Sequence, residues 1–307
     1  NGNLLFYTNG QNVWNRNHVI MTNGSGLLGH QSSSQSAVIV PYPYYPDRYY
    51  IFTVDQLAGS NGVRYSIVDM SLSSGLGAVT ATKNMPLMTD ATEKITAVRH
   101  SNNSDIWVIC HKWGSNQFQA FLVDACNGLN TTPVISNTGT VHNHVSGGYN
   151  TGSIGYMKAS PQGNKLGLAL FTQASPSATN FELFDFNNAT GVVSNPISLP
   201  SPSTTPLPPG IPWYRAYGVE FSPDGTYFYG GLNSTGEVFQ YDLLAGGSTA
   251  IRNSATLVGT ATGSNVNIIG ALQLGTDGRI YVARDGEGWL AHITNPNTSG
   301  AFLTNNG

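Results

Sequence analysis

The stretch AYGVEFSPDGTYFYGGLN, residues 216–233, decides the fold class. Apolar residues alternate with small or polar ones on both sides of the sequence Ser222-Pro223-Asp224-Gly225, which is typical of strands. Pro223 presets the backbone for a turn, Asp224 can bond to the backbone just ahead of it, and Gly225 tolerates a positive φ. The stretch is therefore predicted to form a β-hairpin.

Three other stretches repeat this pattern. They are ITAVRHSNNSDIWVICHKW (95–113), IGYMKASPQGNKLGLAL (154–170) and IGALQLGTDGRIYVARDG (269–286). A third alternating stretch follows each hairpin, and a looser fourth one often closes the repeat. Four antiparallel strands per repeat are typical of a propeller blade. We therefore expect an all-β fold, a β-propeller of four-stranded antiparallel blades, with residues 1–307 as a single domain.

The positions of the turns predict the number of blades. Six turn anchors fall near Gly2, Asp47, Ser104, Gly163, Gly225 and Gly278. They predict six blades. The alternative is a seventh blade shared between the two ends of a longer chain, in which residues 301–304 form its first or closing strand. Residues 1–21 lack the inner strand that should precede them. We therefore expect the chain to be a segment of a longer multidomain protein, or else a mature form that lacks part of a blade.

Composition argues against several classes of protein. The chain has 13 Lys and Arg against 16 Asp and Glu, a net charge of −3, and no basic run, so we do not expect nucleic-acid binding. No apolar run approaches the roughly 20 residues of a membrane span. The expected register places Cys110 and Cys126 too far apart to bond. Scarce charge with abundant Asn and Thr favours an exported surface protein.

One polar residue recurs in the first strand of four repeats, five positions before the turn anchor. These residues are Arg99, Lys158, Glu220 and Gln273. First strands line the channel of a propeller, so we expect a ring of polar groups, with Glu220 paired to Lys158 or Arg99, and His100 one step along. Charges on a crowded strand are costly unless paired. The ring is therefore either a network that joins the blades or a polar pocket for a small ligand.

Four aromatic residues fall in loops rather than on alternating strands. They are Trp113, Tyr149, Trp213 and Tyr214. The flat face of an exposed ring can stack on a sugar. Contact with a glycan or a protein is one interpretation, and cover for blade edges is the other.

The histidines offer one metal hypothesis. His142 and His144 have the spacing to lie on one side of an extended segment, and His111 or His100 could add a ligand. No carboxylate lies nearby in the sequence, and no calcium loop of the D-x-D-x-D kind occurs. We therefore predict neither a metal nor a cofactor.

Several strings, taken together, resemble the β-propeller region of large exported surface proteins of Bacteroidetes. They include GNLLFYTNGQNVWNRN, GYMKASPQG, YGVEFSPDG and GALQLGTDGRIYVARDG. Proteins of that group often carry PKD-type domains and a sorting domain associated with gliding motility and type IX secretion. The resemblance implies a location at the cell surface or in the medium and further domains in the parent chain. It implies no catalytic residues.

We expect a non-enzymatic module that binds a protein or a glycan at the cell surface, in adhesion or surface assembly. The candidate binding residues are Arg99, His100, Lys158, Glu220, Gln273, Trp113, Trp213 and Tyr214. One alternative is a hydrolase or lyase that works at the channel mouth through the charged members of this set. The Asp boxes of sialidase-type propellers and the Ser nucleophile elbow do not occur. The other alternative is a structural subunit of a surface layer or filament.

Overall fold

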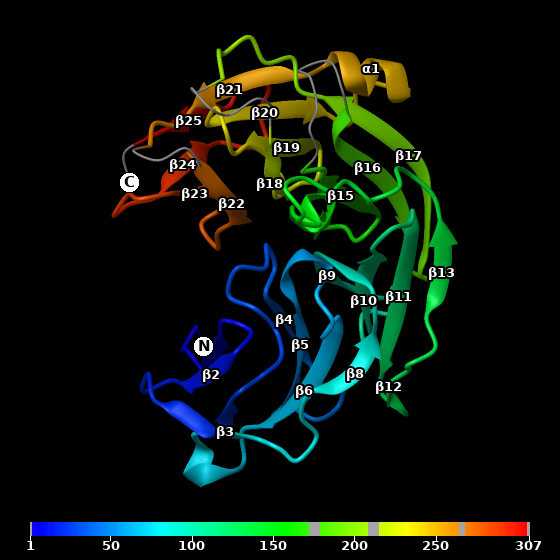
Figure 1. The fold of residues 1–307 in the computed structure, drawn as a ribbon, viewed down its shortest axis with the longest axis vertical. Coiled ribbons are helices and arrows are strands. Elements are labelled where there is room, and N and C mark those ends of the chain that lie inside the picture. The colour runs from blue at the N-terminus through cyan, green and yellow to red at the C-terminus, as the bar shows by residue number, and fades with distance from the viewer. Residues whose placement is uncertain (1, 172–178, 208–214, 264–267, 306–307) are drawn as a thin grey trace. The chain divides into compact units, whose positions relative to one another are not determined.

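The fold consists almost entirely of β-strands. The computed structural model of the protein describes residues 2–171, 179–207, 215–263 and 268–305. Within these ranges there are 25 strands, one α-helix and three short 3-10 helices, so the all-β prediction is confirmed. The chain divides into two compact units, residues 1–143 with 188–192 (unit 1) and residues 144–187 with 193–307 (unit 2) (Figure 1).

The stretch that decides the fold class forms the predicted hairpin. Strand β18 (Ala216–Phe221) pairs antiparallel with β19 (Tyr227–Leu232). At the turn, the Gly225 N–H donates to the Ser222 carbonyl at 2.9 Å, and Gly225 has a φ of +68°. The Asp224 carboxylate accepts a hydrogen bond from the Ser222 hydroxyl at 2.7 Å. The residues that indicate a turn in the sequence are thus the ones that hold it.

Unit 2 contains three sheets of four strands each among the described residues, and each sheet keeps the order of the chain. Its elements are η3 (Thr151–Ser153), β14 (Met157–Ala159), β15 (Lys165–Ala169), β16 (Thr179–Asn187), β17 (Val192–Pro200), β18, β19, β20 (Glu237–Asp242), α1 (Ser248–Asn253), β21 (Thr256–Thr260), β22 (Ile269–Leu274), β23 (Ile280–Arg284), β24 (Ala291–Thr294) and β25 (Phe302–Thr304). These four-stranded antiparallel sheets are the propeller-type blades that the repeats predict.

Unit 1 contains two sheets, one of eight strands and one of five. Its elements are β1 (Phe6–Thr8), β2 (Asn12–Asn15), β3 (Ile20–Ser25), β4 (Ala37–Pro41), β5 (Arg48–Val54), η1 (Gln56–Ala58), β6 (Val63–Asp69), η2 (Ser73–Gly75), β7 (Ala78–Val79), β8 (Met85–Met88), β9 (Ala91–Arg99), β10 (Ile106–Lys112), β11 (Gln117–Asp124), β12 (Gly128–Leu129) and β13 (Val134–Asn137). In the smaller sheet, β12 and β13 both pair with β11.

The predicted number of six blades, with seven as the alternative, is wrong. The described residues form four sheets of four or five strands and one eight-stranded sheet. A parallel pair between Thr22 of β3 and Ala78 of β7 joins the strands of the first two repeats into one sheet. Strand β7 has only two residues, too few for a pattern to reveal. The strand near residues 301–304 starts no seventh blade, because β25 pairs with β24 and completes the last sheet.

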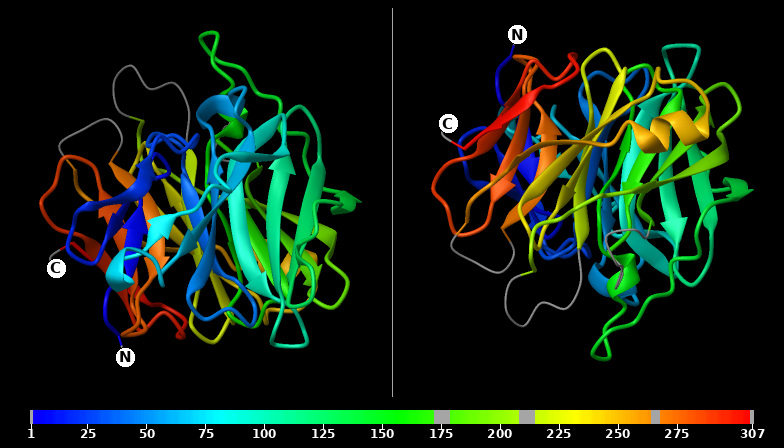
Figure 2. Two further views of the ribbon diagram at one scale, coloured as in Figure 1. Left: turned by 90° about the horizontal axis from the view of Figure 1, so that it is seen from below. Right: turned by 90° about the horizontal axis from the view of Figure 1, so that it is seen from above.

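The core of each unit lies between the faces of its sheets. In unit 2, the buried rings of Phe181 and Phe228 meet edge to face between two sheets, with their centroids 6.3 Å apart. Gly230 lies against the Phe181 ring and Gly167 against the Phe228 ring, where a Cβ atom would collide. Glycine at these two positions lets the sheets approach closely. Helix α1 lies against β20 at the edge of the same unit (Figure 2).

The two cysteines are not bonded to each other. Cys110 is buried in β10, Cys126 is exposed in the turn after β11, and both are free thiols. The prediction that the register keeps them apart is confirmed. Within the described ranges, none of the helices has the length and apolar character that a membrane span requires.

Candidate functional site

Three of the four predicted ring residues lie together in unit 2. Lys158, Glu220 and Gln273 come from β14, β18 and β22, which are the first strands of the three sheets and lie next to one another. The Lys158 Nζ donates to Gln273 Oε1 at 2.7 Å and lies 3.6 Å from Glu220 Oε2. The predicted pairing of Glu220 with Lys158 is confirmed. We call these three residues the inner cluster.

Glu220 is the buried member of the inner cluster, with 6% of its surface exposed. Its Oε1 accepts the Phe221 N–H at 2.9 Å, and its Oε2 accepts the Leu274 N–H at 3.0 Å. These backbone donors from two neighbouring strands fix the orientation of the carboxylate. A carboxylate has about four acceptor positions, so Glu220 retains the capacity to accept a further hydrogen bond.

Lys158 and Gln273 give the inner cluster an accessible side. The Lys158 side chain is 15% exposed, and Gln273 is exposed. The Lys158 ammonium lies 5.8 Å from the centroid of the Tyr156 ring, a cation–π distance. The cluster is therefore closed around Glu220 and open beside Gln273, which is the arrangement a small ligand needs to reach a fixed charge.

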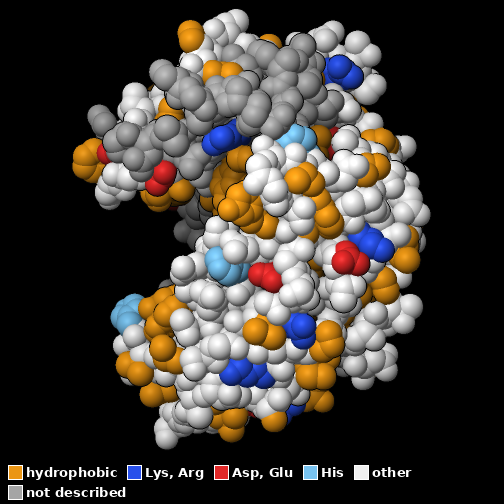
Figure 3. Space-filling view, viewed as in Figure 1, with side chains coloured by type: hydrophobic (Ala, Val, Ile, Leu, Met, Phe, Trp, Pro, Cys, Tyr) orange, Lys and Arg blue, Asp and Glu red, His pale blue; other side chains and the backbone are white. Residues whose placement is uncertain are grey.

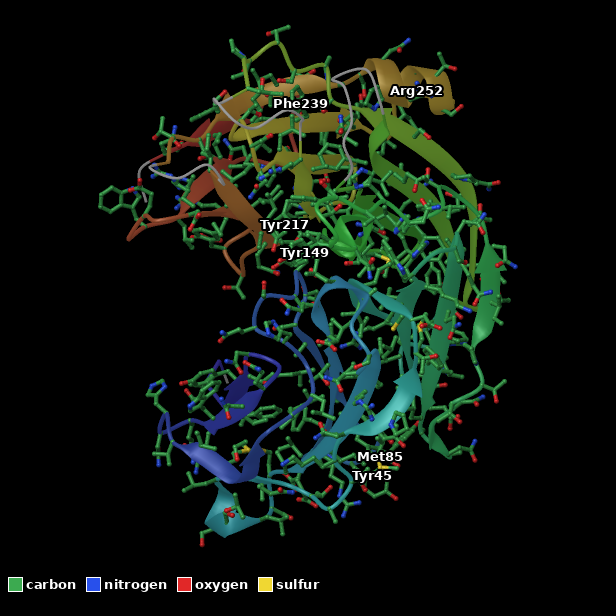
Figure 4. All side chains as sticks on the ribbon, in the orientation of Figure 1. Tyr45, Met85, Tyr149, Tyr217, Phe239 and Arg252 are labelled. Atoms are coloured by element: carbon green, nitrogen blue, oxygen red, sulfur yellow. The ribbon has the colours of Figure 1, made fainter. Side chains whose placement is uncertain are left out.

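A row of aromatic rings continues from Lys158 through unit 2. Tyr156 meets Tyr217 edge-on at 5.5 Å, Tyr217 meets Phe171 at 6.4 Å, and the Arg215 guanidinium lies 5.6 Å from the Phe171 ring. All of these side chains are half-buried. We call Tyr156, Tyr217 and Phe171 the aromatic row; Figure 4 labels Tyr217. The row ends in a cation at each side.

The sequence pattern does not reveal the aromatic row, for a physical reason. Tyr217 lies three positions before Glu220, and strict alternation would place these two side chains on opposite faces of β18. The pairing of β18 with β19 shifts its register between Ala216 and Val219, which is a β-bulge or a similar irregularity. A bulge moves the alternation by one residue. The only sequence signal was Tyr156, two positions before Lys158 on the neighbouring first strand.

Arg99 and His100 belong to unit 1, at the end of β9. Arg99 is exposed, and its Nη1 donates to the Asn103 carbonyl at 3.3 Å. His100 Nδ1 accepts the Asn102 N–H at 3.0 Å, and its Nε2 donates to the Ala189 carbonyl at 3.2 Å. These contacts are local to the turn and to the adjacent segment of unit 1. The role of both residues in a ring stays a prediction.

The structure places two of the four aromatic residues that were predicted to lie in loops. Trp113 lies in the turn after β10, where its backbone N–H donates to the Asp90 carbonyl at 2.6 Å, and Tyr149 is 63% exposed in a loop. Trp213 and Tyr214 lie outside the described residues. The loop positions of Trp113 and Tyr149 are confirmed, and binding through any of the four stays a prediction.

His142 and His144 point to different partners. His142 stacks on His111 in unit 1, with the ring centroids 3.8 Å apart, and both rings are buried. His144 bonds through Nδ1 to the Thr151 hydroxyl at 2.8 Å. Stacked imidazoles direct their in-plane lone pairs side by side rather than toward one ion. Among the described residues, no group of three His, Cys, Asp or Glu is placed to hold a metal.

A second buried carboxylate in unit 2 is enclosed by neutral donors. Glu237, 1% exposed, accepts hydrogen bonds from three hydroxyls, those of Ser203, Thr205 and Thr235. The Thr205 and Thr235 bonds are each 2.7 Å long. This arrangement fastens the segment after β17 to β20, and we call it the hydroxyl cluster.

Charge on the surface is sparse. On the face drawn in Figure 3, the Lys and Arg side chains of the described residues stand apart from one another among uncharged groups. The few ion pairs include Arg48 with Asp69 at 2.9 Å in unit 1 and Lys165 with Asp185 at 2.5 Å in unit 2. The drawn face therefore does not point to a polyanionic partner.

Comparison with known proteins reveals a shared fold. No protein-family model matches the chain, and no curated protein matches its sequence. A candidate 6-phosphogluconolactonase from Bacteroides uniformis is 14% identical with a TM-score of 0.58, covering 98% of this chain and 80% of that one. The periplasmic gluconolactonase of Pseudomonas aeruginosa is 16% identical with a TM-score of 0.56 and the same coverage of 98% and 80%.

A third similar structure belongs to another class of enzyme. Virginiamycin B lyase from Staphylococcus aureus is 10% identical with a TM-score of 0.51, covering 95% of this chain and 76% of that one. At such identities the likeness establishes the propeller-like fold alone.

These similarities correct the prediction of a non-enzymatic module for adhesion or surface assembly. The similar structures include lactonases and a lyase, and the hydrolase alternative agrees with them better. The prediction gives too much weight to the absence of local motifs such as Asp boxes and Ser elbows. Side chains from strands far apart in the sequence can also meet in the folded chain, as Lys158 and Glu220 do.

Proposed function

We propose that this protein is a hydrolase that opens the ring of a sugar lactone at the inner cluster. The observation that carries the proposal is the pairing of a buried carboxylate, Glu220, with the partly exposed ammonium of Lys158 on adjacent first strands. The similarity in fold to a gluconolactonase and to a candidate 6-phosphogluconolactonase supports the choice of substrate.

In the proposed reaction, Glu220 acts as a general base. Its carboxylate takes a proton from water while the water oxygen forms a bond to the lactone carbonyl carbon. The carbonyl oxygen gains the electron pair and becomes an oxyanion, which the Lys158 ammonium stabilises. When the intermediate collapses, the bond from the carbonyl carbon to the ring oxygen breaks. The departing oxygen takes the proton back from Glu220, and the product is an open hydroxy acid.

Gln273 and the aromatic row have supporting roles in this proposal. The bond of 2.7 Å from Lys158 to Gln273 holds the ammonium on the accessible side of the cluster. The Tyr156 ring lies next to Lys158 and offers a flat apolar face, on which a sugar ring can stack. We expect a pyranose lactone stacked there to present its carbonyl to the ammonium.

We also propose that the protein works outside the cytoplasm. The resemblance to exported Bacteroidetes surface proteins supports this location, and so does the periplasmic location of one structurally similar gluconolactonase. Detection of the protein in the periplasmic or extracellular fraction of its bacterium is the expected result. Recovery in the cytoplasmic fraction alone would refute this location and leave the enzymatic proposal standing.

The test is a panel of lactones that includes glucono-1,5-lactone, 6-phosphoglucono-1,5-lactone and a lactone without hydroxyl groups. The wild-type protein is expected to open at least one sugar lactone faster than buffer does. Lys158→Met is expected to lower kcat about 10²–10³-fold, the usual cost of losing one oxyanion donor.

The matched control is Arg48→Met. It breaks an ion pair with Asp69 on the surface of unit 1 and should leave the rate unchanged. A wild-type protein that opens none of the lactones above the spontaneous rate overturns the proposal, and so does full activity in Lys158→Met.

A further inference from the structure

Unit 2 contains a cavity of about 510 Å³ that the proposed reaction does not use. Its walls come from β15, β16 and β17 and from the connection between β20 and β21, whereas the inner cluster lies on the first strands. A volume of this size lies within the ordinary range of roughly 300–1,000 Å³ for small-molecule sites.

One end of the cavity carries two opposite charges. Lys165 and Asp185 are cross-strand neighbours on β15 and β16, and the Lys165 Nζ lies 2.5 Å from Asp185 Oδ1. Asn195 donates from Nδ2 to Asp185 Oδ2 at 2.7 Å. The Lys165 and Asp185 side chains are 30% and 41% exposed, so a ligand can reach both.

The backbone at Asn195 supports this polar end. Asn195 has a φ of +53°, in the left-handed region, and Pro196 follows it. Asn tolerates this conformation better than most residues. Burial raises the pKa of Asp185, but the hydrogen bonds from Lys165 and Asn195 outweigh that effect and hold the pKa below its ordinary value. Asp185 therefore stays charged at neutral pH.

Apolar side chains make up most of the remaining wall of the cavity. Leu183 and Ile251 are buried, and Ile197 and Leu243 are half-buried and packed against the same hydrophobic core. Ile251 comes from α1, where the next residue, Arg252, is exposed and labelled in Figure 4. The cavity thus joins a paired cation and anion to an apolar wall.

We propose that this cavity binds a free α-amino acid with an apolar side chain, in its zwitterionic form. The ligand carboxylate lies on Lys165, its ammonium lies on Asp185, and its side chain lies against Ile197, Leu243 and Ile251. An ammonium has three N–H donors, and the bond to Asp185 uses one of those on Lys165. A partly exposed ion pair contributes little to stability on its own, so the ligand can rearrange it at low cost.

A ligand with a single charge fits this site less well. A simple carboxylate would place its charge near Asp185, and a simple amine would place its charge near Lys165. Only a head group that carries both signs matches both side chains. This site is independent of the proposed lactone chemistry, because none of its residues belongs to the inner cluster.

The experiment is calorimetric titration of the full chain with L-leucine, L-phenylalanine and three partial analogues. The analogues are 4-methylpentanoate, which lacks the ammonium, 3-methylbutylamine, which lacks the carboxylate, and glycine, which lacks the side chain. L-Leucine or L-phenylalanine is expected to bind at least tenfold more tightly than each analogue.

Lys165→Met and Asp185→Asn are each expected to weaken that binding at least tenfold, with circular dichroism unchanged. Arg48→Met, which breaks an ion pair in unit 1, should bind as the wild type does. The proposal is overturned if neither amino acid binds, if an analogue with one charge binds equally well, or if both folded variants keep full affinity. The comparison of ligands on the wild-type chain tests the proposed amino acid site even if a variant fails to fold.

Discussion

Glu220 and Glu237 are buried glutamates of the same four-stranded sheet, on β18 and β20, and their surroundings differ. Glu237 accepts hydrogen bonds from three hydroxyls, which come from the segment after β17 and from the residues just before β20. Glu220 accepts two backbone N–H groups and lies 3.6 Å from an ammonium that also bonds to an exposed amide. Burial alone therefore does not distinguish the two carboxylates. An accessible cation beside it is what separates the inner cluster from the hydroxyl cluster.

The largest expected effect separates the two glutamates by activity. Glu220→Gln removes the proposed general base and should lower kcat for lactone opening about 10²–10⁴-fold. Glu237→Gln should keep the wild-type rate per folded molecule, because Glu237 is enclosed by hydroxyls and takes no part in the proposed reaction. Initial rates, corrected for the folded fraction from circular dichroism, make the comparison. Equal losses in both variants would remove the distinction between the two clusters.

The second prediction separates them by stability. Glu237→Gln replaces a charged acceptor of three hydroxyls by a neutral amide, which cannot accept all three bonds in the same way. A hydrogen bond to a charged group contributes about 1.5–3 kcal/mol, so the free energy of unfolding should fall by about that amount or more. Urea unfolding of the variant and the wild type measures the difference. A midpoint equal to that of the wild type contradicts the structural role.

The third prediction extends the comparison to unit 1, where the buried polar pair is His111 and His142. Burial is the main cause of the lowered pKa of both rings. The charge of Lys94 lowers the pKa of each ring further, and His142 also lowers the pKa of His111. The unfolded chain therefore binds more protons than the native one below the ordinary His pKa of about 6.5. The stabilisation is present above that pH and is lost as the pH falls through it.

Urea unfolding at pH 7.5 and pH 5.5 checks this effect. Replacement by a neutral ring in His111→Phe should reduce the loss of stability on acidification. An identical dependence on pH in wild type and His111→Phe is the contrary outcome.

The smallest expected effect concerns Gln273, which we propose to position Lys158 within the inner cluster. Gln273→Leu removes the acceptor that holds Lys158 on the accessible side. The lost bond is charge-assisted, so we expect a decrease of about tenfold in kcat/KM, in line with roughly 1.5 kcal/mol. Stability should change little because Gln273 is exposed. Steady-state kinetics on the best lactone of the panel supplies the measurement, and an unchanged kcat/KM excludes the positioning role.

The elements of the fold follow closely from local sequence signals. The Ser222-Pro223-Asp224-Gly225 turn and its alternating flanks give β18 and β19 to within a residue, because turn chemistry and alternation act locally. The number of blades could not be predicted from these local signals. A single parallel pair, Thr22 with Ala78, depends on two segments far apart in sequence, which no local pattern records.

The candidate site was partly predictable for the same reason. Lys158, Glu220 and Gln273 could be placed together because equal distances from equivalent turns bring residues to equal heights on adjacent strands. Tyr217 could not, because the irregularity in β18 changes which face its side chain occupies. The three hydroxyls around Glu237 come from two separate segments, and only the folded chain brings them to one carboxylate.

The most direct test of the central claim is proton release during lactone opening. It is measured at constant pH for the wild type, Glu220→Gln, Lys158→Met and the double variant. Two residues of one catalytic cluster should not act additively, so the double variant should be hardly slower than the worse single variant. The contrary result is a wild type that releases protons no faster than buffer, or a double variant whose loss equals the product of the two single losses.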